Sequence, residues 1–242
     1  MNTKHILLTS ALVVSALAFT SCEDFFDTSS KKDLNTETAY SNLESAEMAL
    51  VGCYDGWQRT ISDEGVGMYL LAEFASEQAF AGLGLSDAKN NNVIDQFNLG
   101  IAPSYNDIFN VDWQNYYKAI FRCNQLIVQE DNIDWAGDIK AQGRVMGEAH
   151  AIRGILYFDL VRMFGDVPLL TAPSEENIPR SPASDVYQLI FEDFKYAIEH
   201  IPADAYPLDN NDTNDGRITK YAAEALMARA YLYHTGYYGA EH

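Results

Sequence analysis

The stretch that decides the fold is GEAHAIRGILYFDLVRMFGDVPLL, residues 147–170. Nearly every position from Val145 to Phe164 is apolar, a pattern typical of a helix that is buried on all sides or spans a membrane. The exceptions are Glu148, His150, Arg153, Asp159 and Arg162. Several of these side chains are ionisable and would be costly to place in hydrocarbon, so the stretch predicts a central core helix that ends at Gly165.

Two further features predict how this helix packs. A stripe of small residues recurs at steps of four, four and three positions, namely Gly143, Gly147, Ala151 and Gly154. Each helical glycine costs about 1 kcal/mol relative to alanine, so we expect another helix to approach this stripe closely. The charged residues are spaced for ion pairs within the helix, Arg144 with Glu148 and Asp159 with Arg162.

The rest of the chain is also predicted to be mainly helical. Apolar periodicity and capping residues indicate helices over Thr36–Gln58, Asp112–Gln129, Ile139–Phe164, from Ser181-Pro182 to Ile201, and from Thr219 to a stop at Gly236. Helices paired through short turns favour an all-α fold of tetratricopeptide-like (TPR-like) repeats, although no strict 34-residue period is present. Between the first two helices we expect a long irregular loop, residues 76–110.

The N-terminus has the features of an export signal. Lys4 and His5 precede an apolar run that is followed by Thr20, Ser21 and Cys22. Cleavage after Ala18 would release a soluble protein, whereas cleavage before Cys22 would produce a lipid-anchored one. Because the cysteine falls at the end of the apolar run, we predict a lipoprotein with a signal peptide over 1–21, a tether over 22–35 and a helical domain over 36–242.

Charge and cysteine content exclude several classes of protein. The formal charge is −19, and removing residues 1–21 takes away one lysine and no acid, which leaves −20. Such a chain repels phosphate backbones, so we expect no nucleic-acid partner. Cys53 and Cys123 do not have the spacing of a metal site, and we expect buried thiols, with a disulfide left open.

The loop over residues 76–110 is the candidate ligand-binding segment. Sugars are held by aromatic faces together with amides, carboxylates and arginines. The candidate side chains are Glu77, Gln78, Phe80, Asp87, Asn90, Asn91, Asn92, Phe97 and Tyr105. The alternative is a solvated loop whose aromatic residues anchor it to the scaffold. Outside the loop, Trp113 is expected in the core, while Trp57 and Trp135 stay open as stacking platforms.

Motifs for catalysis and metal binding are missing from the sequence. It contains no HExxH, GxSxG, P-loop or GxGxxG pattern, so we predict neither an enzyme nor a cofactor. The stretch NDTNDG, residues 211–216, begins like a calcium loop, but position twelve is Ala222 where a glutamate is needed. We therefore interpret this stretch as a turn and predict no metal site.

Several segments together resemble the RagB/SusD family, the surface nutrient-binding lipoproteins of Bacteroidetes. They are SCEDFFD, WQNYYKAIFRCNQLI, GEAHAIRGILYFDLVRMFGDVPLL, PRSPASDVYQLIFEDFKYAIEHIP and GRITKYAAEALMARAYLYHTGYYG, in that order. The resemblance implies a SusD-like helical protein on the outer face of the outer membrane. It would capture a glycan or other nutrient and deliver it to a SusC-like TonB-dependent β-barrel transporter.

The length of the chain and the alternative functions qualify this resemblance. Family members usually continue for about as long again, so we expect a chain that is truncated at its C-terminus and a ligand site that is incomplete. The alternative function is a lipid-anchored helical-repeat scaffold that binds another protein and no small molecule. A periplasmic hydrolase is a third class, and turnover of a labelled oligosaccharide would distinguish it.

Overall fold

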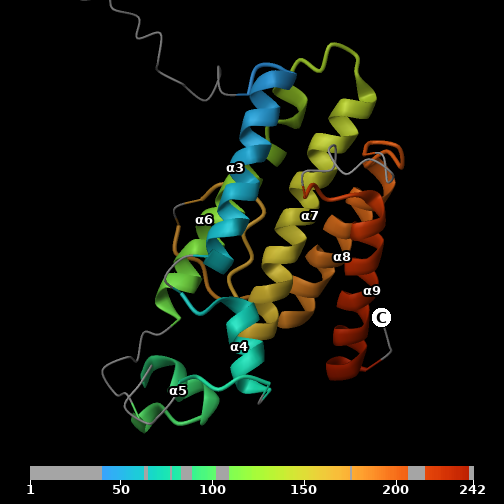
Figure 1. Ribbon diagram of the computed structural model, residues 1–242. Coiled ribbons are helices and arrows are strands. Elements are labelled where there is room, and N and C mark those ends of the chain that lie inside the picture. Colours follow the sequence, from blue (N-terminus) through green and yellow to red (C-terminus); the bar gives the residue numbers. More distant parts are fainter. Residues whose placement is uncertain are drawn as a thin grey trace, which may run out of the picture. The chain divides into compact units, whose positions relative to one another are not determined.

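A computed structural model describes residues 40–62, 65–76, 78–82, 89–101, 109–174, 176–206 and 216–239 (Figure 1). Its described elements are helices, joined by turns and two isolated β-bridges. The α-helices are α3 (Leu43–Ser62), α4 (Gly67–Ala75), α5 (Lys89–Asp95), α6 (Asn110–Ile127), α7 (Ile139–Phe164), α8 (Ala183–His200) and α9 (Lys220–Tyr238). Short 3-10 helices cover Leu99–Ile101 (η2) and Glu130–Asn132 (η4). The prediction of a mainly helical fold is confirmed.

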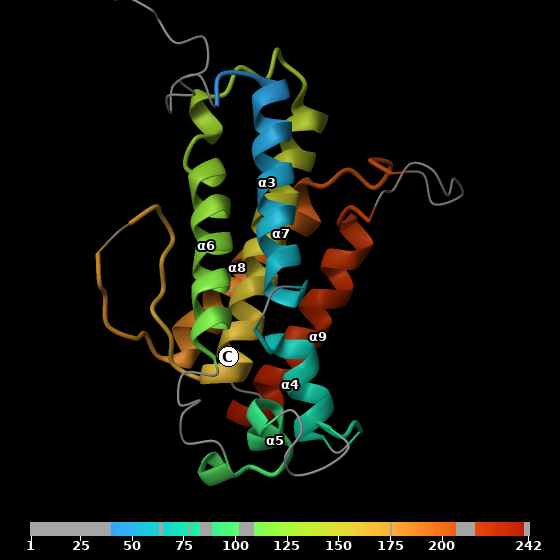
Figure 2. The ribbon, with the colours of Figure 1, turned by 60° about the vertical axis from the view of Figure 1, so that its left-hand side comes forward.

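The long helices pack as successive antiparallel neighbours, which is the arrangement of TPR-like helical pairs. Figures 1 and 2 show α3 beside α6, α7 between α3 and α8, and α9 against α8. Between α6 and α7 the Tyr116 hydroxyl bonds Asp159, and Asn124, two turns further along α6, bonds Arg153. Residue numbers thus rise on one helix as they fall on its neighbour, as in an antiparallel helix pair.

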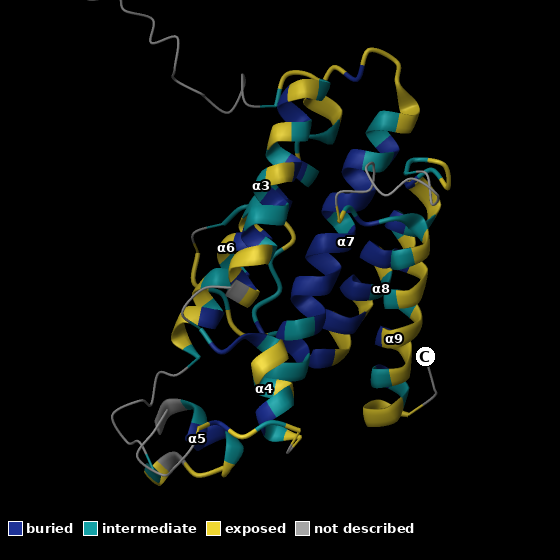
Figure 3. Ribbon diagram, in the orientation of Figure 1, coloured by how far each residue is buried: buried dark blue, intermediate teal, exposed yellow. Residues whose placement is uncertain are grey.

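Helix α7 forms the centre of the core, as its apolar sequence predicts. Figure 3 shows it buried over most of its length. The stripe of small residues faces α8: a Cβ added at Gly143 would lie 2.5 Å from the carbonyl oxygen of His200, and one at Gly147 would lie 2.5 Å from Ile201. The glycines therefore offset their conformational cost by letting α8 approach closely.

The charged residues inside α7 are paired. The Arg153 guanidinium donates to both carboxylate oxygens of Asp193 on α8, at 2.9 and 2.8 Å, and to the amide oxygen of Asn124 at 2.7 Å. His150 Nδ1 lies 2.6 Å from the same carboxylate. The predicted pairs Arg144–Glu148 and Asp159–Arg162 are both present. A buried charge is tolerated only with such partners, so this network fixes the register of α6, α7 and α8.

Some predicted boundaries are wrong. The first long helix begins at Leu43 because Asn42 caps it: the Asn42 side-chain oxygen accepts from the Ser45 N–H at 3.0 Å. The helix continues to Ser62, four residues beyond the predicted end. The last helix runs through Gly236 and ends at Gly239, whose φ of 88° suits glycine alone. Helices α4 and α5 were not predicted, and α5 with η2 gives the expected irregular loop local helical order.

Other predictions concern single residues. Cys53 and Cys123 are free and fully buried, as expected. Trp113 packs against the core. Trp135 is 9% exposed and its indole N–H donates to the Glu130 carbonyl at 3.0 Å, so it offers no stacking face. None of the described helices has the length and apolarity that a bilayer crossing requires. Residues 211–215 of the calcium-like stretch and Cys22 lie outside the described residues.

Candidate functional site

The site is organised around α4, whose start is held by one carboxylate. The Val66 N–H donates to Asp112 Oδ2 at 3.0 Å, and the Gly67 N–H donates to Oδ1 at 2.8 Å. Asp112 is 1% exposed, and this burial raises the pKa of its carboxyl while the two N–H donors oppose the rise. Gly67 has φ of 61°, and a Cβ there would lie 2.8 Å from the Thr60 carbonyl oxygen. The turn from α3 into α4 therefore requires glycine.

A small second core fastens the predicted ligand-binding loop to α4. Its buried members are Val66, Phe74, Ala81 and Ile94, with Leu71, Ala75, Ala79 and Phe109 packed against them. These residues come from α4 and its N-cap, the chain that follows α4, α5 and the N-cap of α6, so the loop is anchored by its own side chains Ala79, Ala81, Ile94 and Phe109. The alternative role for the loop, attachment to the scaffold, thus accounts for these residues.

The predicted ligand contacts differ in their accessibility. Phe80 and Phe97 are 89% and 74% exposed, and Gln78 is also at the surface. Asn91 is half-buried, whereas Asn92 is 4% exposed, so its amide is directed away from solvent. Glu77, Asp87, Tyr105 and the side chain of Asn90 lie outside the described residues. Phe97 adopts φ of 48°, an uncommon backbone conformation for a phenylalanine.

A pocket of about 690 Å³ lies between α3, α4, α7 and α9. Its walls are mainly apolar and aromatic, with Trp57 from α3 and Tyr69 from α4 among them. Tyr69 is 66% exposed, although its ring borders the pocket. The charged residues of the lining are Glu73, Asp159, Arg162, Arg217 and Arg229. An apolar cavity of this size with a few converging polar groups is the usual form of a small-molecule site.

One end of the pocket is built on Asp159 and Arg162 of α7. Asp159 pairs with Arg162 and accepts from the Tyr116 hydroxyl at 3.0 Å. The Arg162 guanidinium also lies over the rings of Phe158, at 4.1 Å from the centroid, and of Tyr233, at 5.2 Å. Burial raises the pKa of Asp159, while hydrogen bonding from Arg162 lowers the pKa of Tyr233. This end therefore combines a fixed guanidinium with aromatic faces.

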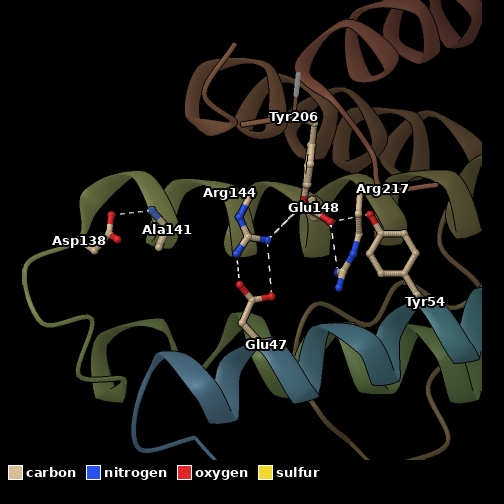
Figure 4. A network of polar contacts seen from close by, with 8 residues as sticks. All are labelled: Glu47, Tyr54, Asp138, Ala141, Arg144, Glu148, Tyr206 and Arg217. Carbon is tan, nitrogen blue, oxygen red and sulfur yellow. Dashed lines mark hydrogen bonds and ion pairs between the residues drawn. The ribbon is translucent and has the colours of Figure 1, made fainter. Parts of the chain in front are cut away.

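Arg217, which lines the pocket, also belongs to a network around Glu148, which is fully buried (Figure 4). Its Oε1 accepts from the Tyr206 hydroxyl at 2.6 Å and from Arg144 at 3.2 Å, and Arg144 also pairs with Glu47. Its Oε2 accepts from the Tyr54 hydroxyl at 2.6 Å.

The same carboxylate positions the wall that α9 contributes to the pocket. Arg217 Nη1 lies 3.6 Å from Glu148 Oε2, and the Ile218 N–H donates to the Tyr54 hydroxyl at 2.8 Å. Tyr206 follows α8 and Arg217 precedes α9, so one side chain of α7 holds both segments that flank residues 207–215.

A second groove lies between α8 and α9 and has a different chemistry. Its lining is apolar except for Glu224, and it includes Phe191, Met227 and Leu232. Sugars need several hydrogen-bonding partners, which this groove lacks. The pocket beside α4 is therefore the better candidate site.

Sequence reasoning found part of this pocket. Trp57, a candidate stacking platform in the sequence, lines the pocket. The sequence did not predict that Tyr69, Arg162 and Arg229 would lie together, because they come from three helices that are distant in sequence. No local spacing signals such a combination, and only the packing of α4 and α9 against α7 brings it together.

Comparison with known proteins identifies relatives of this chain. Residues 24–232 match the SusD-like family model described as starch-binding and associating with the outer membrane. The SusD-like protein P38 of Formosa agariphila is 24% identical over 98% of this chain and 44% of its own length. A SusD-like protein of Bacteroides ovatus is 24% identical over 96% of this chain and 41% of its own. The chain spans less than half the length of these relatives.

Solved structures agree in fold. A SusD homologue from Bacteroides thetaiotaomicron superposes with a TM-score of 0.67 at 26% identity, covering 86% of this chain and 39% of that one. A laminarin-binding SusD-like protein superposes with a TM-score of 0.63 at 29% identity, covering 81% and 41%. Since the family match extends from the chain after Cys22 into α9, the chain belongs to the SusD-like family of starch-binding proteins associated with the outer membrane.

Proposed function

We propose that this protein is a lipoprotein, anchored through Cys22 to the outer membrane and facing the exterior, that binds a glycan and delivers it to a SusC-like TonB-dependent transporter. Beyond family membership, one observation carries the proposal: the pocket beside α4 combines aromatic faces with guanidiniums and carboxylates. The laminarin-binding relative supports a glycan as the ligand.

The proposed mechanism is capture and release, with no bond broken. Trp57 and Tyr69 would pack against the apolar C–H faces of a sugar ring, and the charged side chains would bind its hydroxyl groups. Because α7 holds Asp159 and Arg162 in a rigid core, these polar groups are already oriented before the ligand arrives. Preorganisation of this kind lowers the entropic cost of binding.

Phe80 and Phe97 are proposed as a second contact surface for a longer glycan. Both are exposed aromatic residues on the segment that the small core attaches to α4. Exposed aromatic side chains on an anchored loop would extend the binding surface beyond the pocket. The two surfaces can be separated by mutation, because neither Phe80 nor Phe97 lines the pocket.

The test is calorimetric titration of the mature protein with laminarin oligosaccharides. Tyr69→Ala should weaken binding by about tenfold, the value of one stacking contact of about 1.4 kcal/mol. The double change Phe80→Ala with Phe97→Ala should reduce affinity for long oligosaccharides more than for short ones. Tyr237→Ala, at a tyrosine that is 78% exposed and does not line the pocket, is the matched control. Unchanged affinity in the Tyr69 variant would remove the pocket from the proposal.

Delivery to a transporter needs a separate measurement. The lipidated protein should be isolated from its own outer membranes in mild detergent, with mass analysis of the material that co-purifies. A large β-barrel protein in near-equal amount is the expected result, together with an acylated Cys22. An acylated protein that emerges without such a partner would contradict the delivery step and leave glycan capture to stand alone.

The scaffold alternative is favoured by one feature, the apolar groove between α8 and α9. Leu232 and Tyr231 are 70% and 52% exposed there. A folded protein with no affinity for any oligosaccharide would favour this alternative over glycan capture.

A further inference from the structure

The pocket beside α4 has the opposite charge balance to the rest of the chain. The whole sequence contains 35 acidic side chains and 16 lysines and arginines. The pocket is lined by three arginines, Arg162, Arg217 and Arg229, and by only two carboxylates, Glu73 and Asp159. Guanidiniums thus gather at the one concave surface that has the size and the mixed chemistry of a ligand site.

Two of the three arginines are paired with carboxylates of the fold. Arg162 pairs with Asp159 inside α7, where both side chains are largely buried. Arg217 lies 3.6 Å from the buried Glu148. The ion pairs among the described residues do not include Arg229, which is exposed on α9 and lines the pocket. Its guanidinium lowers the pKa values of Asp159 and Tyr233, so it acts on the same part of the pocket while staying exposed to a ligand.

Arg229 and Arg162 converge on one position. Arg162 Cζ lies 5.2 Å from the centroid of the Tyr233 ring, and Arg229 lines the same pocket; both guanidiniums lower the pKa of that phenol, Arg162 more strongly than Arg229. Arg162 approaches from α7, and Arg229 stands one helical turn before Tyr233 on α9. Two guanidiniums beside one phenol create a local preference for negative charge.

We propose that this end of the pocket binds the anionic group of an acidic sugar, a carboxylate or a sulfate ester. Arg229 would be the main donor, Arg162 would provide the fixed second guanidinium, and Trp57 would face the sugar ring. Guanidinium matches the planar oxygens of such groups and can bind them through two hydrogen bonds. Glu73 lies on the α4 side of the pocket, where it would accept hydrogen bonds from sugar hydroxyls.

This inference rests on the proposed glycan-binding function and makes it more specific. A neutral sugar needs hydrogen-bond donors but gains nothing from an excess of positive charge. In a chain of formal charge −19, long-range repulsion disfavours any acidic ligand, so its binding requires a local site of this kind. The three arginines and two carboxylates of the pocket therefore favour an acidic sugar over a neutral one as the ligand.

The experiment compares three probes of equal length by calorimetry with the mature protein: a neutral glucan trisaccharide, an oligogalacturonate and a sulfated trisaccharide. One or both acidic probes should bind more tightly than the neutral one. Arg229→Gln should weaken the acidic probe by about tenfold or more, the range of one hydrogen bond between charged groups, and should change neutral binding by less than about threefold. Circular dichroism checks that this exposed substitution leaves the fold intact.

Arg180→Gln is the matched control. It removes the same charge from an exposed arginine that does not line the pocket, and it should leave all three affinities unchanged. Equal losses in both variants would mean a general charge effect and would overturn the inference. Preferred binding of the neutral probe, with no effect of Arg229→Gln, would also overturn it while the proposed function stands. Failure of all three probes to bind would count against the proposed function as well.

Discussion

The Tyr54 hydroxyl on α3 donates a 2.6 Å hydrogen bond to Oε2 of Glu148, at a position on α7 that has no solvent exposure. The same hydroxyl accepts the Ile218 N–H at 2.8 Å. One phenol thus links α3, α7 and the chain that enters α9. Burial and the neighbouring carboxylate raise the pKa of Tyr54 well above its usual range, so it remains a hydrogen-bond donor at all physiological pH values.

Tyr54→Phe should therefore destabilise the protein by about 1–3 kcal/mol, because it leaves the Ile218 N–H and one Glu148 oxygen short of a buried partner. Urea denaturation followed by circular dichroism measures the change. Tyr69→Phe, at a tyrosine that is 66% exposed, is the control and should alter the unfolding free energy by less than about 0.5 kcal/mol. Equal effects in the two variants would contradict the structural role of Tyr54.

Glu148→Ala should be more damaging, by about 3–5 kcal/mol, because it removes the partner of a buried charge network. Arg144 and Arg217 would lose a counter-charge, and Tyr54 and Tyr206 would lose their acceptor. The measurement is the midpoint and slope of urea unfolding. Glu199→Ala removes a carboxylate that is 55% exposed and 4.0 Å from Lys195, and it should stay within about 0.5 kcal/mol of the parent.

The glycine stripe predicts opposite outcomes for two Gly→Ala changes in helices. At Gly143 the new Cβ would lie 2.5 Å from the His200 carbonyl oxygen, a backbone atom that can move only with α8. Gly143→Ala should cost about 1–3 kcal/mol through overpacking. At Gly52 no atom lies within 4 Å of the added Cβ, so Gly52→Ala should stabilise by about 0.5–1 kcal/mol. Thermal unfolding of both variants tests the pair, and a gain at Gly143 would refute close packing of α7 on α8.

The buried carboxyl of Asp159 predicts a pH dependence of stability. Burial raises its pKa above the ordinary 3.8, against the opposing effects of Arg162 and Tyr116. The folded protein then holds this proton more tightly than the unfolded chain, so its contribution to the unfolding free energy falls as the pH rises from about 3.8 through the folded pKa. Above that window the contribution is constant.

Asp159→Asn should remove this dependence. It also breaks the pair with Arg162 and lowers stability at every pH, so the informative quantity is the slope. Urea unfolding of both proteins between about pH 4 and pH 7 should show a steeper decline in the parent. Parallel curves for parent and variant would mean that the pKa of Asp159 is not raised.

The sequence by itself determined the elements with strong local signals. The body of α7 follows from its apolar run, and its C-terminal boundary follows from Gly165, which has φ of 68° and ends the helix. The ion pairs of Arg144 with Glu148 and of Asp159 with Arg162 follow from helical spacing. The close approach of another helix follows from the small residues at regular steps, because a smooth helix face admits a neighbouring backbone; only the structure shows that this helix is α8. Each of these depends only on residues within one or two helical turns.

Only the tertiary structure decided where a ligand could bind. Helix α4 was missed because its nine residues carry no side-chain cap of their own, and its start is held by Asp112, far along the chain. The pocket combines Trp57, Tyr69, Arg162 and Arg229, which come from four different helices. Their proximity follows from how α4 and α9 pack beside α7, with α9 positioned by the buried carboxylate of Glu148. Local periodicity cannot encode such long-range contacts, because each helix pattern specifies a buried face and not the partner that covers it.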